Sequence, residues 1–85
     1  MTMSKTILTP DQCLLLHDFA VDADLTPGWT YSKLVSVRSQ LLDLGLLELD
    51  EDFGWITISD EGLRRLDTPA AHRVLRARAE RRARA

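Results

Sequence analysis

Six arginines near the end of the chain have the most evident chemistry: Arg73, Arg76, Arg78, Arg81, Arg82 and Arg84. A guanidinium group stays protonated at physiological pH and forms paired hydrogen bonds with phosphate oxygens. At helical spacing these arginines surround the helix axis and form no single charged face. Two interpretations follow: the segment binds the phosphate backbone of a nucleic acid, or it is a solvated helix that balances acidic charge elsewhere in the chain.

A second group of polar side chains occupies residues 32–43. If a helix begins after Thr30, its inward face is apolar and its opposite face carries small polar residues. The candidate contact residues are Ser32, Lys33, Ser36, Ser39 and Gln40. In the major groove of double-stranded DNA, Gln40 can pair with adenine through two hydrogen bonds, the serines can contact bases or phosphates, and Lys33 can reach a guanine or a phosphate. The alternative is an ordinary solvated helix face.

The residues before this segment predict another helix and a turn. Thr9, Pro10 and Gln12 form a capping-box pattern, and residues 13–21 are apolar on nearly every side, as expected for a helix in the middle of a small domain. A helix-turn-helix also requires a positioning helix before the recognition helix. The Pro-Gly turn that follows leaves two alternatives: the positioning helix is reduced to about one turn over residues 22–25, or it begins at Tyr31 and the recognition helix begins near residue 36.

The residues that follow predict a β-hairpin. Gly45 suits a helix C-cap because it can adopt a positive φ without steric cost. Residues 46–49 and 55–58 are prone to form β-strands, and residues 50–54 form the turn between them.

Two further helices are predicted after the hairpin. Ser59 is the expected cap of a short helix whose Leu63 and Leu66 should point to the core. Thr68, followed by proline, is the expected cap of a last helix that includes the arginines.

Three features of residues 39–66 carry a family resemblance: a Leu-Gly-Leu step at residues 44–46, a hairpin turn at residues 50–54, and an Ile-Thr segment that leads to a glycine at residues 56–62. This run resembles the second half of a winged helix-turn-helix domain of the MarR or PadR type. The resemblance implies a mainly α fold with a small β-hairpin wing, built from three core helices and a C-terminal helix. It also implies DNA binding and dimerisation through terminal helices, although winged helices serve as protein-interaction modules too.

The tip of the predicted wing is acidic. It reads Asp50-Glu51-Asp52, whereas wings that lie along DNA usually carry Arg or Lys. Because like charges repel, this tip is expected to avoid phosphates. The recognition helix and the arginines must then hold DNA alone, and the acidic wing is a candidate docking surface for a protein.

Charge is divided unequally along the 85 residues. Residues 1–72 carry five basic and twelve acidic side chains, a net charge of −7, whereas residues 73–85 carry six arginines and one glutamate, a net charge of +5. Such asymmetry suggests a tail that binds an anionic partner. We therefore divide the chain into a flexible N-terminus (1–8), a winged-helix domain (9–68) and an arginine-rich C-terminal helix or tail (69–85).

Composition and motifs exclude several classes of protein. With 45% hydrophobic and 28% charged residues, and without a long apolar run or a secretory signal, the chain is expected to be cytoplasmic and to have no membrane partner. The single Cys13 can form no internal disulfide and should be buried. No catalytic constellation, metal-ligand spacing or phosphate-binding glycine loop is evident, so we expect no enzyme, metal or cofactor.

These observations favour one function over two alternatives. The favoured function is a small sequence-specific protein that binds double-stranded DNA, a transcriptional regulator. It would insert the helix of residues 32–43 in the major groove, repeat this contact as a homodimer, and add phosphate contacts from residues 73–84. The alternatives are a protein-interaction module that uses the acidic wing and body, and an RNA-binding protein that uses the tail.

Overall fold

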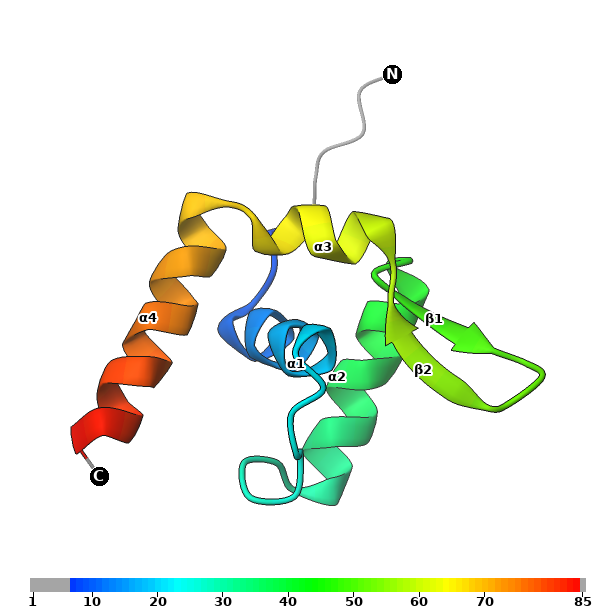
Figure 1. Cartoon of the computed structure of the whole chain (residues 1–85), viewed down its shortest axis with the longest axis horizontal. Helices are drawn as coiled ribbons and strands as arrows, with labels where there is room; N and C mark the ends of the chain where they lie inside the picture. Colours follow the sequence, from blue (N-terminus) through cyan, green and yellow to red (C-terminus); the bar gives the residue numbers. More distant parts are fainter. Residues whose placement is uncertain (1–6, 85) are drawn as a thin grey trace.

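The computed structural model describes residues 7–84, which form four helices and a two-stranded antiparallel sheet. In chain order these are α1 (Pro10–Ala20), α2 (Tyr31–Asp43), β1 (Leu47–Asp50), β2 (Trp55–Ile58), α3 (Asp60–Leu66) and α4 (Pro69–Arg84). α1 lies in the centre and contacts both α2 and α4, and the hairpin projects from the end of the molecule opposite α4 (Figure 1). The predicted combination of helices with a small β-hairpin is confirmed.

α1 begins as the sequence predicts and supplies the centre of the core. Thr9 Oγ1 accepts a hydrogen bond from the Gln12 N–H (3.2 Å), and Gln12 Oε1 accepts one from the Thr9 N–H (2.9 Å). Leu15 and Leu16 are fully buried. Cys13 is buried too, as predicted, and burial raises the pKa of its thiol.

The predicted flexible N-terminus falls mostly on residues 1–6, which lie outside the described residues. Ile7 is exposed, and Leu8 packs against the core. Leu8 is thus the last residue of the predicted segment, and its side chain contacts the body of the protein.

The connection between α1 and α2 contains no positioning helix. Residues 21–30 form turns, with Asp22 at a φ of 55° and a hydrogen bond from the Gly28 N–H to the Leu25 carbonyl oxygen (3.3 Å). α2 continues from Tyr31 to Asp43 without a break, so a separate helix start near residue 36 is wrong. At residues 22–25, where the other alternative places a reduced positioning helix, the structure has no helical turn: Asp22 belongs to a turn, and residues 23–25 are irregular.

α2 ends in a Schellman motif that directs the chain into the hairpin. Gly45 has a φ of 74°, its N–H donates to the Leu42 carbonyl oxygen (3.1 Å), and the Leu46 N–H donates to that of Leu41 (2.9 Å). Leu46 and Leu47 follow directly and are buried in the core. The predicted glycine cap is confirmed, and it turns these two leucines inward.

The hairpin has one apolar face and one polar face. Leu47 pairs with Ile58 and Asp50 with Trp55 across the strands. Because side chains alternate along a strand, the polar face carries Glu48, Asp50, Trp55 and Thr57. In the turn, Asp50 Oδ1 accepts a hydrogen bond from the Asp52 N–H (2.9 Å), and Gly54 adopts a φ of 71°.

α3 packs closely against the segment that joins α2 to β1. Ser59 Oγ accepts a hydrogen bond from the Gly62 N–H (3.0 Å) and donates one to the Gly45 carbonyl oxygen (2.7 Å), so the predicted cap is confirmed. A Cβ on Gly62 would overlap the Leu46 carbonyl oxygen. This contact orients Gly62 and Leu66 inward, and Leu63, a quarter-turn away, is 50% exposed. The expectation that Leu63 points to the core is wrong.

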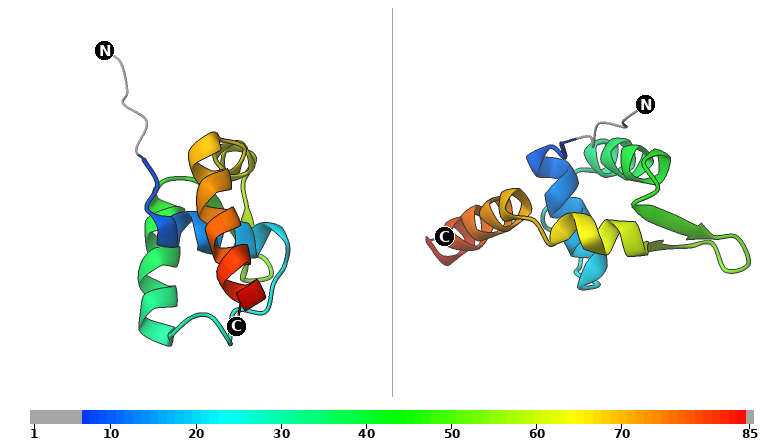
Figure 2. Two further views of the ribbon diagram at one scale, coloured as in Figure 1. Left: turned by 90° about the vertical axis from the view of Figure 1, so that its left-hand side faces the viewer. Right: turned by 90° about the horizontal axis from the view of Figure 1, so that it is seen from above.

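The arginine-rich segment is a helix that lies against the body. Thr68 Oγ1 accepts a hydrogen bond from the Ala71 N–H (3.2 Å), which confirms the predicted cap, and Ala71 is buried where α4 packs on α1. Figure 2 shows α4 beside α1 in both views. No helix within residues 7–84 has the length and hydropathy needed to cross a membrane.

Candidate nucleic-acid interface

The outer face of α2 carries the small polar side chains that were predicted to read DNA. Ser32, Ser36 and Ser39 are exposed, and helical spacing places them opposite the buried Val37 and Leu41. Each hydroxyl can both donate and accept hydrogen bonds. This outer face can therefore contact base edges or phosphates without rearrangement of the core.

Lys33 and Gln40 lie at the border of this face and contact α1. Lys33 Nζ is 3.2 Å from Asp11 Oδ2 and 6.0 Å from the centroid of the Trp29 ring. Gln40 Oε1 accepts a hydrogen bond from Gln12 Nε2 (2.9 Å). In a two-bond contact between Gln40 and adenine, this oxygen must either accept from both Gln12 and the base or exchange Gln12 for the base.

Docking of α4 on α1 gives the six arginines different positions. Since Ala71 is the buried position of α4, helical spacing turns Arg78 and Arg82 toward the body and leaves Arg81 at the side of the helix. It turns the other three outward, namely Arg73, Arg76 and Arg84. The Arg78 side chain is only 12% exposed, whereas the other five arginine residues are exposed. Arg78 is consequently held within the protein, and five of the six predicted arginines remain accessible to a phosphate.

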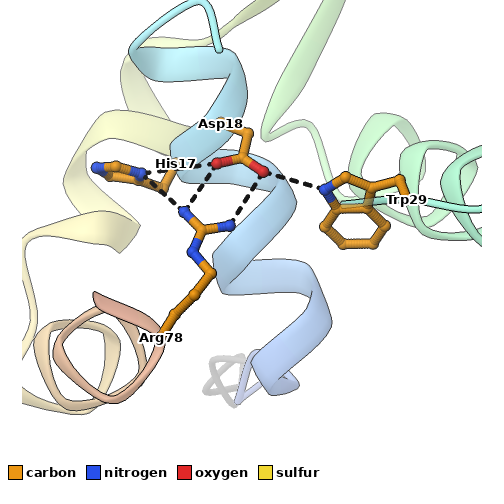
Figure 3. A network of polar contacts seen from close by, with 4 residues as sticks. All are labelled: His17, Asp18, Trp29 and Arg78. Atoms are coloured by element: carbon orange, nitrogen blue, oxygen red, sulfur yellow. Dashed lines mark hydrogen bonds and ion pairs between the residues drawn. The ribbon is translucent and has the colours of Figure 1, made fainter. Parts of the chain in front are cut away.

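Arg78 is the centre of a buried polar network between α4, α1 and the loop before α2 (Figure 3). Its two terminal nitrogens donate to the two carboxylate oxygens of Asp18, at 2.8 and 3.0 Å. Trp29 Nε1 donates to Asp18 Oδ2 (3.0 Å), and His17 Nδ1 lies 3.3 Å from Arg78 Nη2. Asp18, Trp29 and Arg78, which are far apart in sequence, thus hold α1, the loop before α2 and α4 together.

The electrostatics of this network keep Asp18 ionised. Burial alone would raise the pKa of the Asp18 carboxyl group, but hydrogen bonds from Arg78 and Trp29 and the positive charges of Arg78 and Arg82 outweigh burial and lower it. Sequence analysis missed this network. Its one visible signal is that Asp18 is an acidic residue within the otherwise largely apolar run of residues 13–21, where a carboxylate must find a partner if the helix is central.

The C-terminal turn of α4 lies beside the loop that leads into α2. Arg82 reaches this loop through its side chain: Arg82 Nη2 is 3.8 Å from the point where a Cβ on Gly28 would lie. Arg81 and Arg84 belong to the same turn and are exposed. The guanidinium group of Arg82 is therefore placed next to the loop that leads into α2.

The hairpin has a different character from α2 and α4. Phe53 and Trp55 are 73% and 69% exposed, and their ring centroids are 6.2 Å apart. The exposed acidic residues around them are Glu48, Asp50, Glu51 and Asp52. With a net charge of −4 and two exposed aromatic rings, residues 47–58 are suited to a cationic or apolar partner, not to phosphate. We refer to residues 47–58 as the acidic hairpin.

Within residues 7–84, no group of three or more His, Cys, Asp or Glu residues is arranged to hold a metal ion. Comparisons with protein-family models, curated proteins and solved structures give no match to the chain.

Proposed function

We propose that this protein is a small DNA-binding transcriptional regulator and that residues 9–68 are a winged-helix domain in which turns replace the positioning helix. The observation that carries the proposal is the exposed serine face of α2, together with an arginine of α4 that reaches the loop before α2. Ser32, Ser36 and Ser39 are exposed, and the Arg82 side chain lies near Gly28 in that loop. α2 would enter the major groove, and the C-terminal turn of α4 would contact the adjacent phosphates.

The outer face of α2 would make the base contacts. Ser36 and Ser39 lie at its centre and are exposed. Lys33 contributes at the border, because its ion pair with Asp11 is about half exposed on both sides and such pairs are worth only about 0–1 kcal/mol. A phosphate can therefore replace Asp11 as the partner of Lys33 at little cost.

The arginines of α4 would have different roles. Arg81, Arg82 and Arg84 supply phosphate contacts, since they lie in the turn next to the α2 loop. Arg78 acts indirectly: its pairing with Asp18 holds α4 in the position that brings this turn to the DNA. A second copy of the chain would repeat the same contacts in a second half-site.

Binding to a labelled DNA duplex, followed by fluorescence anisotropy at several salt concentrations, tests this proposal. Each lost phosphate contact reduces the slope of log K against log salt by about 0.9. Replacement of Arg82 and Arg84 by Gln should therefore reduce the slope by about 2 and weaken binding at low salt. Arg64→Gln is the matched control, because Arg64 on α3 is already paired with Glu61 (2.7 Å) and should leave the slope unchanged. Absence of duplex binding by the intact chain at low salt would overturn the proposal.

A further inference from the structure

We propose that the acidic hairpin docks on the outward face of α4 of a second copy of this chain. The hairpin combines exposed aromatic rings, Phe53 and Trp55, with four carboxylates and has no basic residue. A guanidinium group satisfies both features, because it stacks on aromatic rings and forms paired hydrogen bonds with carboxylates. The preferred partner of this surface is therefore a segment with several arginines.

The surface extends from the hairpin into a groove at its base. Trp55 and Ile56 form one wall, and Phe19 and Leu25 form the other, around a volume of about 390 Å3. Asp22, an exposed carboxylate, also lines this groove. The groove thus continues the combination of apolar and acidic side chains and has room for small and long side chains of a docked helix.

The outward face of α4 has the complementary composition. Arg73, Arg76 and Arg84 are exposed, and within residues 7–84 no carboxylate lies within 4 Å of any of them. Exposed alanines and Glu80 lie between them: the alanines allow close approach of another surface, and Glu80 carries the one negative charge of α4. α4 carries a net charge of +5, against −4 for the acidic hairpin.

The position of the two surfaces requires the contact to be intermolecular. The hairpin and α4 lie at opposite ends of the molecule, with α1 between them (Figure 1). Pairing of α4 with α4 of another copy is disfavoured, since it would bring like-charged arginines together, and the apolar Val74 and Leu75 are already half-buried in their own chain. A hairpin–α4 contact joins two different surface patches, which makes it a heterologous interface.

Sedimentation velocity over a concentration series tests this contact in the full chain. At about 0.05 M salt the average sedimentation coefficient should rise with protein concentration, and at about 0.5 M salt the rise should be much smaller because charge pairs at the surface are screened. The variants Glu51→Lys/Asp52→Lys and Arg73→Glu/Arg76→Glu should each weaken self-association by about tenfold or more. Asp43→Lys, which reverses an exposed charge on α2, is the control and should retain it.

Sedimentation of a mixture of the two charge-reversed variants tests the proposed pairing most sharply. The first variant keeps the arginine face and the second keeps the acidic hairpin, so an equimolar mixture should regain association that neither variant shows alone. Circular dichroism of each variant confirms that it is folded, and Trp55→Ser, at a 69% exposed position, provides a second probe of the hairpin surface. A chain that stays monomeric at low salt, or association that survives in both charge-reversed variants, would overturn the proposal.

Discussion

Asp18 and Arg78 are 60 positions apart, yet they form the most buried charged pair among the described residues, with side chains 5% and 12% exposed. Two charges are costly to remove from water, and the cost is offset here by paired hydrogen bonds and by the indole N–H of Trp29. The pair therefore adds little net stability to the fold, and its main effect is to hold α4 in one position. Removal of one partner leaves an uncompensated buried charge.

Arg78→Ala should lower the free energy of unfolding by about 3 kcal/mol, because Asp18 then remains buried without its counter-charge. Urea denaturation followed by circular dichroism measures this change. Arg76→Ala removes an exposed arginine from the same helix and should change stability by less than about 0.5 kcal/mol. Equal effects of the two substitutions would contradict the structural role of Arg78.

Acid should weaken the same network. The pKa of Asp18 is lower in the folded protein than in the unfolded chain, so its contribution is fully present above the unfolded value, about 4, and is lost as pH falls through the folded value. The Asp18→Asn variant has no titratable group at this position. It should be less stable than the wild type at pH 7 and should lose less stability between about pH 5 and pH 2. Unfolding curves with parallel acid dependence in both proteins would contradict this assignment.

At the scale of elements, helix starts and stops were predictable because they depend on residues within a few positions of one another. Thr9, Thr30, Ser59 and Thr68 cap the four helices, and Gly45 ends α2 as expected. Leu66 on α3 points to the core as expected, but the exposure of Leu63 and the burial of Arg78 on α4 were not predictable in this way. They depend on which face of each helix packs against the rest of the protein, and therefore on contacts between distant parts of the chain.

Gly62 shows how such a contact orients an element. Gly62→Ala should lower the free energy of unfolding by about 1–3 kcal/mol, since the added methyl group overlaps the Leu46 carbonyl oxygen, which is backbone and cannot rotate away. Gly28→Ala is the control: its nearest neighbour is the end of the flexible Arg82 side chain at 3.8 Å. Gly28→Ala should be neutral or stabilising by up to about 1 kcal/mol. Thermal and urea unfolding compare the two variants, and a similar small effect of both would contradict the close packing of α3.

At the scale of the whole molecule, charge is sorted in space as well as in sequence. The acidic hairpin lies at one end, α4 at the other, and the outer face of α2 carries small uncharged side chains. The overall division of charge was predictable from the sequence. The candidate interface was only partly predictable from the sequence. The serines of α2 are exposed as expected, whereas Gln40 and Lys33 also contact α1. Arg78 is buried against Asp18.

Binding of duplex DNA by an α2 variant tests the central proposal most directly. Ser36→Glu/Ser39→Glu adds two negative charges to the centre of the proposed reading face and leaves the arginines of α4 intact. Thr57→Glu adds one negative charge at an exposed position of the hairpin and serves as the control. We predict that the α2 variant loses at least about tenfold in affinity at low salt, about 1.4 kcal/mol, while the hairpin control binds as the wild type does. Undiminished binding by the α2 variant, together with complete loss on replacement of the α4 arginines, would contradict groove reading and make α4 alone the nucleic-acid-binding element.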